Sequence, residues 1–72
     1  MFEKVKKILQ QYTEVKAINE TSMLQADLGL SSFDVVEIVT AFEEIFHMEI
    51  PDRDLPKFIS VRDIVEYLEK RV

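Results

Sequence analysis

The sequence predicts a small all-α protein, a bundle of three longer helices and one short one. Apolar residues recur at helical spacing in three segments, and no segment alternates in polarity over the length of a strand. The 72 residues, 47% of them hydrophobic, suit a single domain spanning residues 1–72. With one Gly and two Pro, the chain is neither collagen-like nor of low complexity.

The first helix is predicted near the N-terminus, where lysines and glutamines lie off an apolar stripe. The stripe consists of Phe2, Val5, Ile8, Leu9 and Tyr12. Residues 15–31 lack sustained periodicity and predict a long loop, which we expect Leu24, Leu28 and Leu30 to anchor to the core. Unstructured loops of this length are uncommon in compact domains and often carry function.

The second helix is predicted from Ser32 to Phe46. Ser31 and Asp34 have the spacing of a capping box at its start. The stripe expected to face the core contains Val35, Ile38, Val39, Phe42, Ile45 and Phe46. The opposite stripe contains Phe33, Val36, Glu37, Thr40, Glu44 and His47.

Two apolar residues, Phe33 and Val36, thus lie on the helix face that should meet water. Beside Glu37 they form an apolar patch with an acidic rim, which is typical of a partner-docking surface. Alternatively, both side chains pack beneath the loop of residues 15–31, as small satellite clusters do.

The C-terminal part of the chain predicts one short and one longer helix. Residues 52–56 indicate a brief turn of helix or an irregular link, because Pro56 disfavours helical geometry at Leu55. Ser60, with Asp63 three residues later, caps the last helix. Its inner stripe is Val61, Ile64, Val65, Leu68 and Val72, and the methionines Met23 and Met48 are expected to fill gaps in the core.

The net charge of −5 is concentrated in the middle of the chain. Residues 17–52 contain eight Asp and Glu residues and no Lys or Arg. Such a single-sign field repels nucleic acid and steers basic partners toward the protein, although acidic residues also simply keep small proteins soluble.

Several classes of site are excluded. Without Cys there is no disulfide or zinc-thiolate site, and no apolar run is long enough for a signal peptide or a membrane span, so we expect a cytoplasmic protein that does not enter membranes. His47, the single His, is expected near the solvent about four helical turns from Ser32, too far to activate it as a nucleophile. A calcium loop starting at Asp27 fails at its required positions, Gly29, Ser31, Ser32 and Ile38. A loosely held divalent cation on the acidic helix stays open.

The chain also resembles a known family. The attachment motif of acyl carrier proteins reads D-L-G-x-D-S-L-D and precedes a hydrophobic helix, and it is similar to DLGLSSFDVVE at residues 27–37. The similarity continues through AFEE at 41–44, IPD at 50–52 and VRDIVEYL at 61–68. Three positions depart from the family pattern: Ser31 replaces an acid, Phe33 replaces Leu, and Pro56 falls in the short third helix.

The resemblance implies an acyl-carrier-like bundle that carries phosphopantetheine on Ser32 and is not an enzyme. The position suits a phosphodiester, since helix N-termini attract anions, but serines there are also ordinary caps. The implied partners are a phosphopantetheinyl transferase and the acyl-chain synthases or transferases of fatty acid, or related polyketide or lipid, biosynthesis. These enzymes would have basic docking patches, and the carrier itself would be a freestanding monomer. Docking residues would be Phe33, Val36, Glu37, Thr40 and Glu44, and residues sheltering the cargo would be Leu28, Val35, Val39, Phe42, Ile50, Ile59 and Ile64.

Two alternatives stay open. The first is a dedicated carrier for a specialised pathway or an aminoacyl cargo, which the departures at Ser31 and Phe33 favour. The second is a helical interaction module without a prosthetic group.

Overall fold

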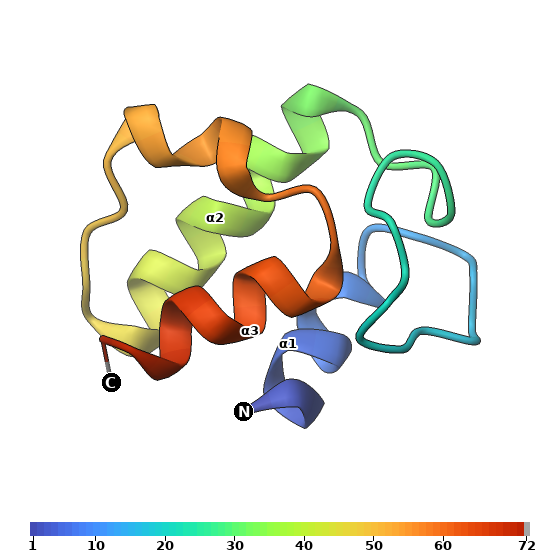
Figure 1. Ribbon diagram of the computed structural model, residues 1–72, viewed down its shortest axis with the longest axis horizontal. Helices are drawn as coiled ribbons and strands as arrows, with labels where there is room; N and C mark the ends of the chain where they lie inside the picture. The colour runs from blue at the N-terminus through green and yellow to red at the C-terminus, as the bar shows by residue number, and fades with distance from the viewer. Residues whose placement is uncertain (72) are drawn as a thin grey trace.

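The computed structural model describes residues 1–71, and four helices follow one another in that part of the chain (Figure 1). They are α1 (Phe2–Leu9), α2 (Ser32–Phe46), the 3₁₀-helix η1 (Asp52–Lys57) and α3 (Val61–Glu69). Within these residues no strand forms, and one isolated antiparallel bridge joins Met23 to Ser60. The all-α prediction is therefore confirmed, while Val72 lies outside the described residues.

Helix α1 buries its predicted stripe. Val5, Ile8 and Leu9 are buried, and Phe2 and Tyr12 are partly buried against the same core. Because α1 contacts both α2 and α3, its apolar face closes one side of the bundle (Figure 1).

The loop between α1 and α2 is confirmed and is well anchored. Leu24, Leu28 and Leu30 are buried, as predicted. Backbone hydrogen bonds also tie the loop to the start of α3, where the N–H of Leu24 donates to Ile59 O at 2.9 Å and the N–H of Val61 donates to Ser22 O at 3.0 Å. The loop therefore has a fixed path to α2 despite its lack of regular structure.

Helix α2 has the predicted bounds, and its predicted core face is correct except at one position. Val35, Ile38, Val39 and Phe42 are buried, and Phe46 is partly buried. Ile45 is 52% exposed, so its assignment to the core was wrong. At the last turn the bundle packs against Phe42 and Phe46, whose ring centroids lie 6.2 Å apart, and Ile45 is left in solvent.

The predictions for the two methionines and the histidine agree with the structure at Met48 and His47 and disagree at Met23. Met48 is partly buried against the core, as predicted, whereas Met23 is 38% exposed and does not fill the core. Its neighbour Leu24 is buried in the core instead. His47 is exposed, as expected, and ends α2 in the left-handed conformation with φ 53°.

Helix η1 is short, as predicted, but it continues through Pro56. Pro56 was expected to push Leu55 out of helical geometry, and it does not. The helix is of the tighter 3₁₀ type and only six residues long, and such a short helix tolerates the loss of the one backbone donor that proline lacks.

Helix α3 begins with the predicted capping box of Ser60 and Asp63 and buries the predicted stripe. The buried residues are Val61, Ile64, Val65 and Leu68. No helix among the described residues is long and apolar enough to cross a membrane. Nor do residues 1–71 contain a group of three or more His, Cys, Asp or Glu residues able to hold a metal ion.

Candidate functional site

The chain reaches the start of α2 through a tight turn. The Asp27 carboxylate accepts the N–H of Met23 at 2.7 Å, and the N–H of Gly29 donates to Gln25 O at 3.2 Å. Gly29 has φ +69°, and a Cβ placed there would meet no atom within 4 Å. Glycine is therefore favoured at this position by its backbone conformation and not by lack of space.

Two leucines and one threonine hold this turn against the bundle. Leu28 and Leu30 are buried on either side of Gly29. The Thr13 hydroxyl donates to Leu28 O at 2.8 Å, and the N–H of Leu30 donates to Leu24 O at 3.0 Å. The first residues of α2 are consequently positioned by the core itself.

The two adjacent serines have different surroundings. Ser31 is the N-cap, where its Oγ accepts the N–H of Asp34 at 3.1 Å, and its own N–H donates to the Asp34 carboxylate at 3.0 Å. Ser32 is the first residue of α2 and is exposed. Its Oγ has only a long contact, 3.5 Å, from the Gln25 amide nitrogen. The predicted cap is thus confirmed for Ser31, and Ser32 is left exposed at the first position of α2.

The start of α2 also suits a phosphate. The first N–H groups of an α-helix lack intrahelical acceptors, and Ser31 Oγ takes the N–H of Asp34 alone among those of the first turn. These groups and the helix dipole make the position favourable for an anion bonded to Ser32.

A groove of about 670 Å³ opens beside Ser32. Its lining comes from the loop before α2, the first two turns of α2, η1 and the segment leading to α3. Most of the lining is apolar: Met23, Ala26, Val35, Val36, Leu55, Pro56, Phe58 and Ile59, with Gln25, Ser32 and Asp52 as the polar members.

The residues predicted to shelter a cargo are divided by the structure. Val35 and Ile59 line the groove. The other five, Leu28, Val39, Phe42, Ile50 and Ile64, are buried in the core and are not part of its lining. Sequence reasoning missed Leu55 and Phe58 because they come from η1 and the link after it, where no periodic pattern marks an inner face.

The five predicted docking residues all lie exposed on α2. Phe33 is 70% and Val36 47% exposed, so the alternative in which both pack beneath the loop is wrong. Glu37 and Glu44 are exposed on the same helix. The hydroxyl of Thr40, also exposed, donates back to Val36 O at 3.0 Å.

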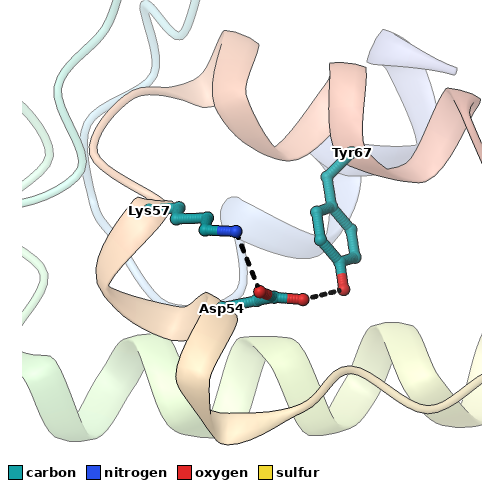
Figure 2. Close-up of polar contacts among 3 residues, drawn as sticks. All are labelled: Asp54, Lys57 and Tyr67. Atoms are coloured by element: carbon teal, nitrogen blue, oxygen red, sulfur yellow. Dashed lines mark hydrogen bonds and ion pairs between the residues drawn. The ribbon is translucent and has the colours of Figure 1, made fainter.

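Sequence reasoning did not single out Asp54, a buried carboxylate of η1 that points toward α3 (Figure 2). Asp54 accepts a hydrogen bond from the Tyr67 hydroxyl at 2.7 Å and pairs with Lys57 at 3.1 Å. The Tyr67 and Lys57 hydrogen bonds hold the pKa of Asp54 below its ordinary 3.8. Burial, followed by the hydrogen bond to Asp54, raises the pKa of Tyr67 above 10.0.

Comparison with known proteins agrees with this geometry. A family model described as a phosphopantetheine attachment site matches residues 3–68. The acyl carrier protein of Campylobacter concisus (strain 13826) is 42% identical over 72 residues, which cover 97% of this chain and 94% of that protein. The acyl carrier protein of Campylobacter lari is 41% identical over 71 residues, covering 96% and 92%. The chain therefore belongs to the acyl carrier protein family, whose prosthetic group is phosphopantetheine.

Proposed function

We propose that this chain is a carrier and not a catalyst. It holds acyl groups on a phosphopantetheine arm attached to Ser32 and delivers them to enzymes of fatty acid, or related polyketide or lipid, biosynthesis. The observation that carries the proposal is the contrast between the two serines. Ser31 is engaged in the capping box, whereas Ser32 presents an exposed hydroxyl at the edge of an apolar groove.

The chain's own residues provide the attachment point for the arm, the surface that partner enzymes recognise and the groove that covers the cargo. Attachment forms a phosphodiester at Ser32 Oγ, with coenzyme A as donor, its nucleotide portion as leaving group, and the hydroxyl proton passing to the transferase. The bound arm contributes a terminal thiol that forms thioesters. The N–H groups of the first turn of α2 stabilise the phosphodiester, and the mostly apolar groove favours an aliphatic cargo over an aminoacyl one.

Docking is proposed for the exposed face of α2. Phe33 and Val36 offer an apolar contact, and Glu37 and Glu44 lie on the same exposed helix surface, in a stretch without Lys or Arg. A phosphopantetheinyl transferase and acyl-transferring enzymes would present basic side chains around a shallow apolar spot. Such contacts give fast, salt-sensitive and modest association, which suits a carrier that must leave each enzyme.

The test is an intact-mass measurement after incubation with coenzyme A and a phosphopantetheinyl transferase. Ser32→Ala should not gain the mass of one arm. Its matched control, Ser31→Ala, should gain it more slowly, because losing a cap costs about 1 kcal/mol of helix stability. Circular dichroism checks that both variants fold. If Ser32→Ala is modified and Ser31→Ala is not, the attachment site is assigned to the wrong serine.

A further inference from the structure

One wall of the groove beside Ser32 is formed by a short 3₁₀-helix with few backbone hydrogen bonds of its own. Asp52, Leu55 and Pro56 of η1, with Phe58 just after it, form this wall. A short 3₁₀-helix has poor hydrogen-bond geometry, and Pro56 contributes no backbone donor. The width of the groove therefore depends on what holds η1 against the rest of the bundle.

Asp54 is not part of the groove's lining, and its carboxylate points toward Tyr67 of α3, which gives η1 a polar attachment to that helix (Figure 2). Asp54 is 6% exposed, and its Oδ2 accepts a hydrogen bond of 2.7 Å from the hydroxyl of Tyr67 on α3. The pair with Lys57 stays within η1, and the Lys57 side chain is 71% exposed, so that contact is weak and does not reach α3.

Tyr67 touches the same wall a second time through its ring. The ring packs edge-on against Phe58, with centroids 5.1 Å apart, and the Arg71 guanidinium lies 3.7 Å from the Tyr67 ring centroid. Phe58 lines the groove and Tyr67 does not. A single α3 side chain, Tyr67, thus contacts η1 through Asp54 and the segment after η1 through Phe58.

We infer that Tyr67 and Asp54 are positioning residues that set the width of the groove and thereby the length of acyl chain the carrier retains. This inference rests on the proposed function, in which the groove shelters the cargo. With the bond intact, Leu55 and Phe58 stay close to α2 and the groove is narrow. Without it, η1 moves outward more readily, and the groove accepts longer chains while holding short ones less firmly.

The test compares Tyr67→Phe with the parent protein. This substitution removes the hydroxyl and keeps the ring contacts with Phe58 and Arg71. A matched control is Tyr12→Phe, at a partly buried tyrosine whose hydroxyl makes no hydrogen bond within the described residues. Asp54→Asn should give an intermediate result, because an amide oxygen still accepts from Tyr67 while the charge opposite Lys57 is lost.

The first measurement needs no cargo. Hydrogen exchange is followed at the N–H of Asp54, which donates to Pro51 O, and at the N–H of Phe58, which donates to Leu55 O. Tyr67→Phe should speed both by about tenfold or more, a loss typical of one hydrogen bond to a charged group. Tyr12→Phe should leave both rates unchanged. If Tyr67→Phe leaves them unchanged too, the inference is overturned, whatever the cargo does.

The second measurement uses the arm-bearing protein loaded with acyl chains of increasing length. In Tyr67→Phe the chain length giving the largest rise in Tm should be longer than in the parent and in Tyr12→Phe. An unchanged profile alongside faster exchange would refute a role in selecting cargo. If the parent shows no dependence on the acyl chain at all, the sheltering part of the proposed function fails, independently of how η1 is held.

Discussion

Filling the groove beside Ser32 with a bulky side chain should remove the stabilisation that an acyl cargo confers. Ala26 is exposed and lines the groove, so Ala26→Phe places a ring in the space proposed for the cargo. Ala17→Phe is the matched control, because Ala17 is equally an exposed loop alanine and is not part of the lining. Both variants should accept the arm, since neither alters Ser32 or the capping box.

The expected size of the effect follows from the groove's chemistry. Burying one methylene is worth about 0.8 kcal/mol, so a two-carbon extension that is fully buried adds about 1.6 kcal/mol. The groove is open to solvent, and if half of the chain's surface is covered, the gain is roughly 0.8 kcal/mol per two-carbon step. For a domain of this size that corresponds to a rise in Tm of about 3–6 °C per step before the cost of ordering the chain.

The assay is thermal unfolding of the arm-bearing protein with no cargo and with butanoyl, hexanoyl, octanoyl, decanoyl and dodecanoyl groups. Tm should rise stepwise in the parent and in Ala17→Phe, then level off once the groove of about 670 Å³ is filled. In Ala26→Phe the series should be nearly flat. Equal, stepwise gains in both variants would refute the placement of the cargo in this groove.

Three further predictions concern the turn, the docking face and pH. Gly29→Ala should lower the free energy of unfolding, measured by urea denaturation, by roughly 1 kcal/mol, and Gly29→Asn should lower it by less, because Asn tolerates positive φ better than Ala. Equal losses in the two variants would contradict the argument from the backbone conformation of Gly29. Glu37→Lys should raise the apparent KM of the transferase in a salt-dependent way and Phe33→Ser in a salt-independent way, with helical circular dichroism unchanged; an unaltered KM in both excludes this face. Asp54 has a lowered pKa in the folded protein, so its contribution to the free energy of unfolding is present above pH 3.8 and is lost as the pH falls further. Tyr67 has a raised pKa, so its contribution is present below pH 10.0 and is lost as the pH rises through the pKa of the folded state. Tm measured against pH should fall at both ends, and Tyr67→Phe should fall less steeply at each; identical profiles would refute the pairing. The charged groups facing this pair are Lys57, Arg53 and Arg71.

Local signals in the sequence predicted the helices well. Ser31 with Asp34, and Ser60 with Asp63, predict helix starts from a pattern only four residues long, and both capping boxes form. The bounds of α2 and the buried stripe of α3 likewise follow from spacing within one segment. Where a position depends on what packs against it, the same reasoning fails. Ile45 lies on the stripe of α2 that is predicted to face the core and is nevertheless exposed, because Phe42 and Phe46 make the contact between the last turns of α2 and the core.

The candidate site was predictable in part for the same reason. Ser32 and the exposed face of α2 lie within one continuous stretch, and the family pattern falls on that stretch. The groove combines residues from the loop, α2, η1 and the segment before α3, which only the tertiary structure brings together. The burial of Asp54 could not be predicted, because an Asp in a polar segment is expected to be exposed. It depends on Tyr67, which is 13 residues away in the sequence and donates a hydrogen bond to Asp54.

The departure at Ser31 from the family's usual acid has a physical consequence at the attachment site. Ser and Asp cap helices about equally well, so the capping box survives the change, and Asp34 still completes it. What changes is the charge one residue away from Ser32. An acid there would lie close to the phosphodiester proposed for Ser32 and would repel it, whereas the Ser31 hydroxyl is neutral. The first turn of α2 keeps its geometry, because the Asp34 carboxylate accepts one hydrogen bond from the Ser31 N–H at 3.0 Å. A neutral Ser31 therefore leaves the phosphodiester proposed at Ser32 without a negative charge on the residue before it.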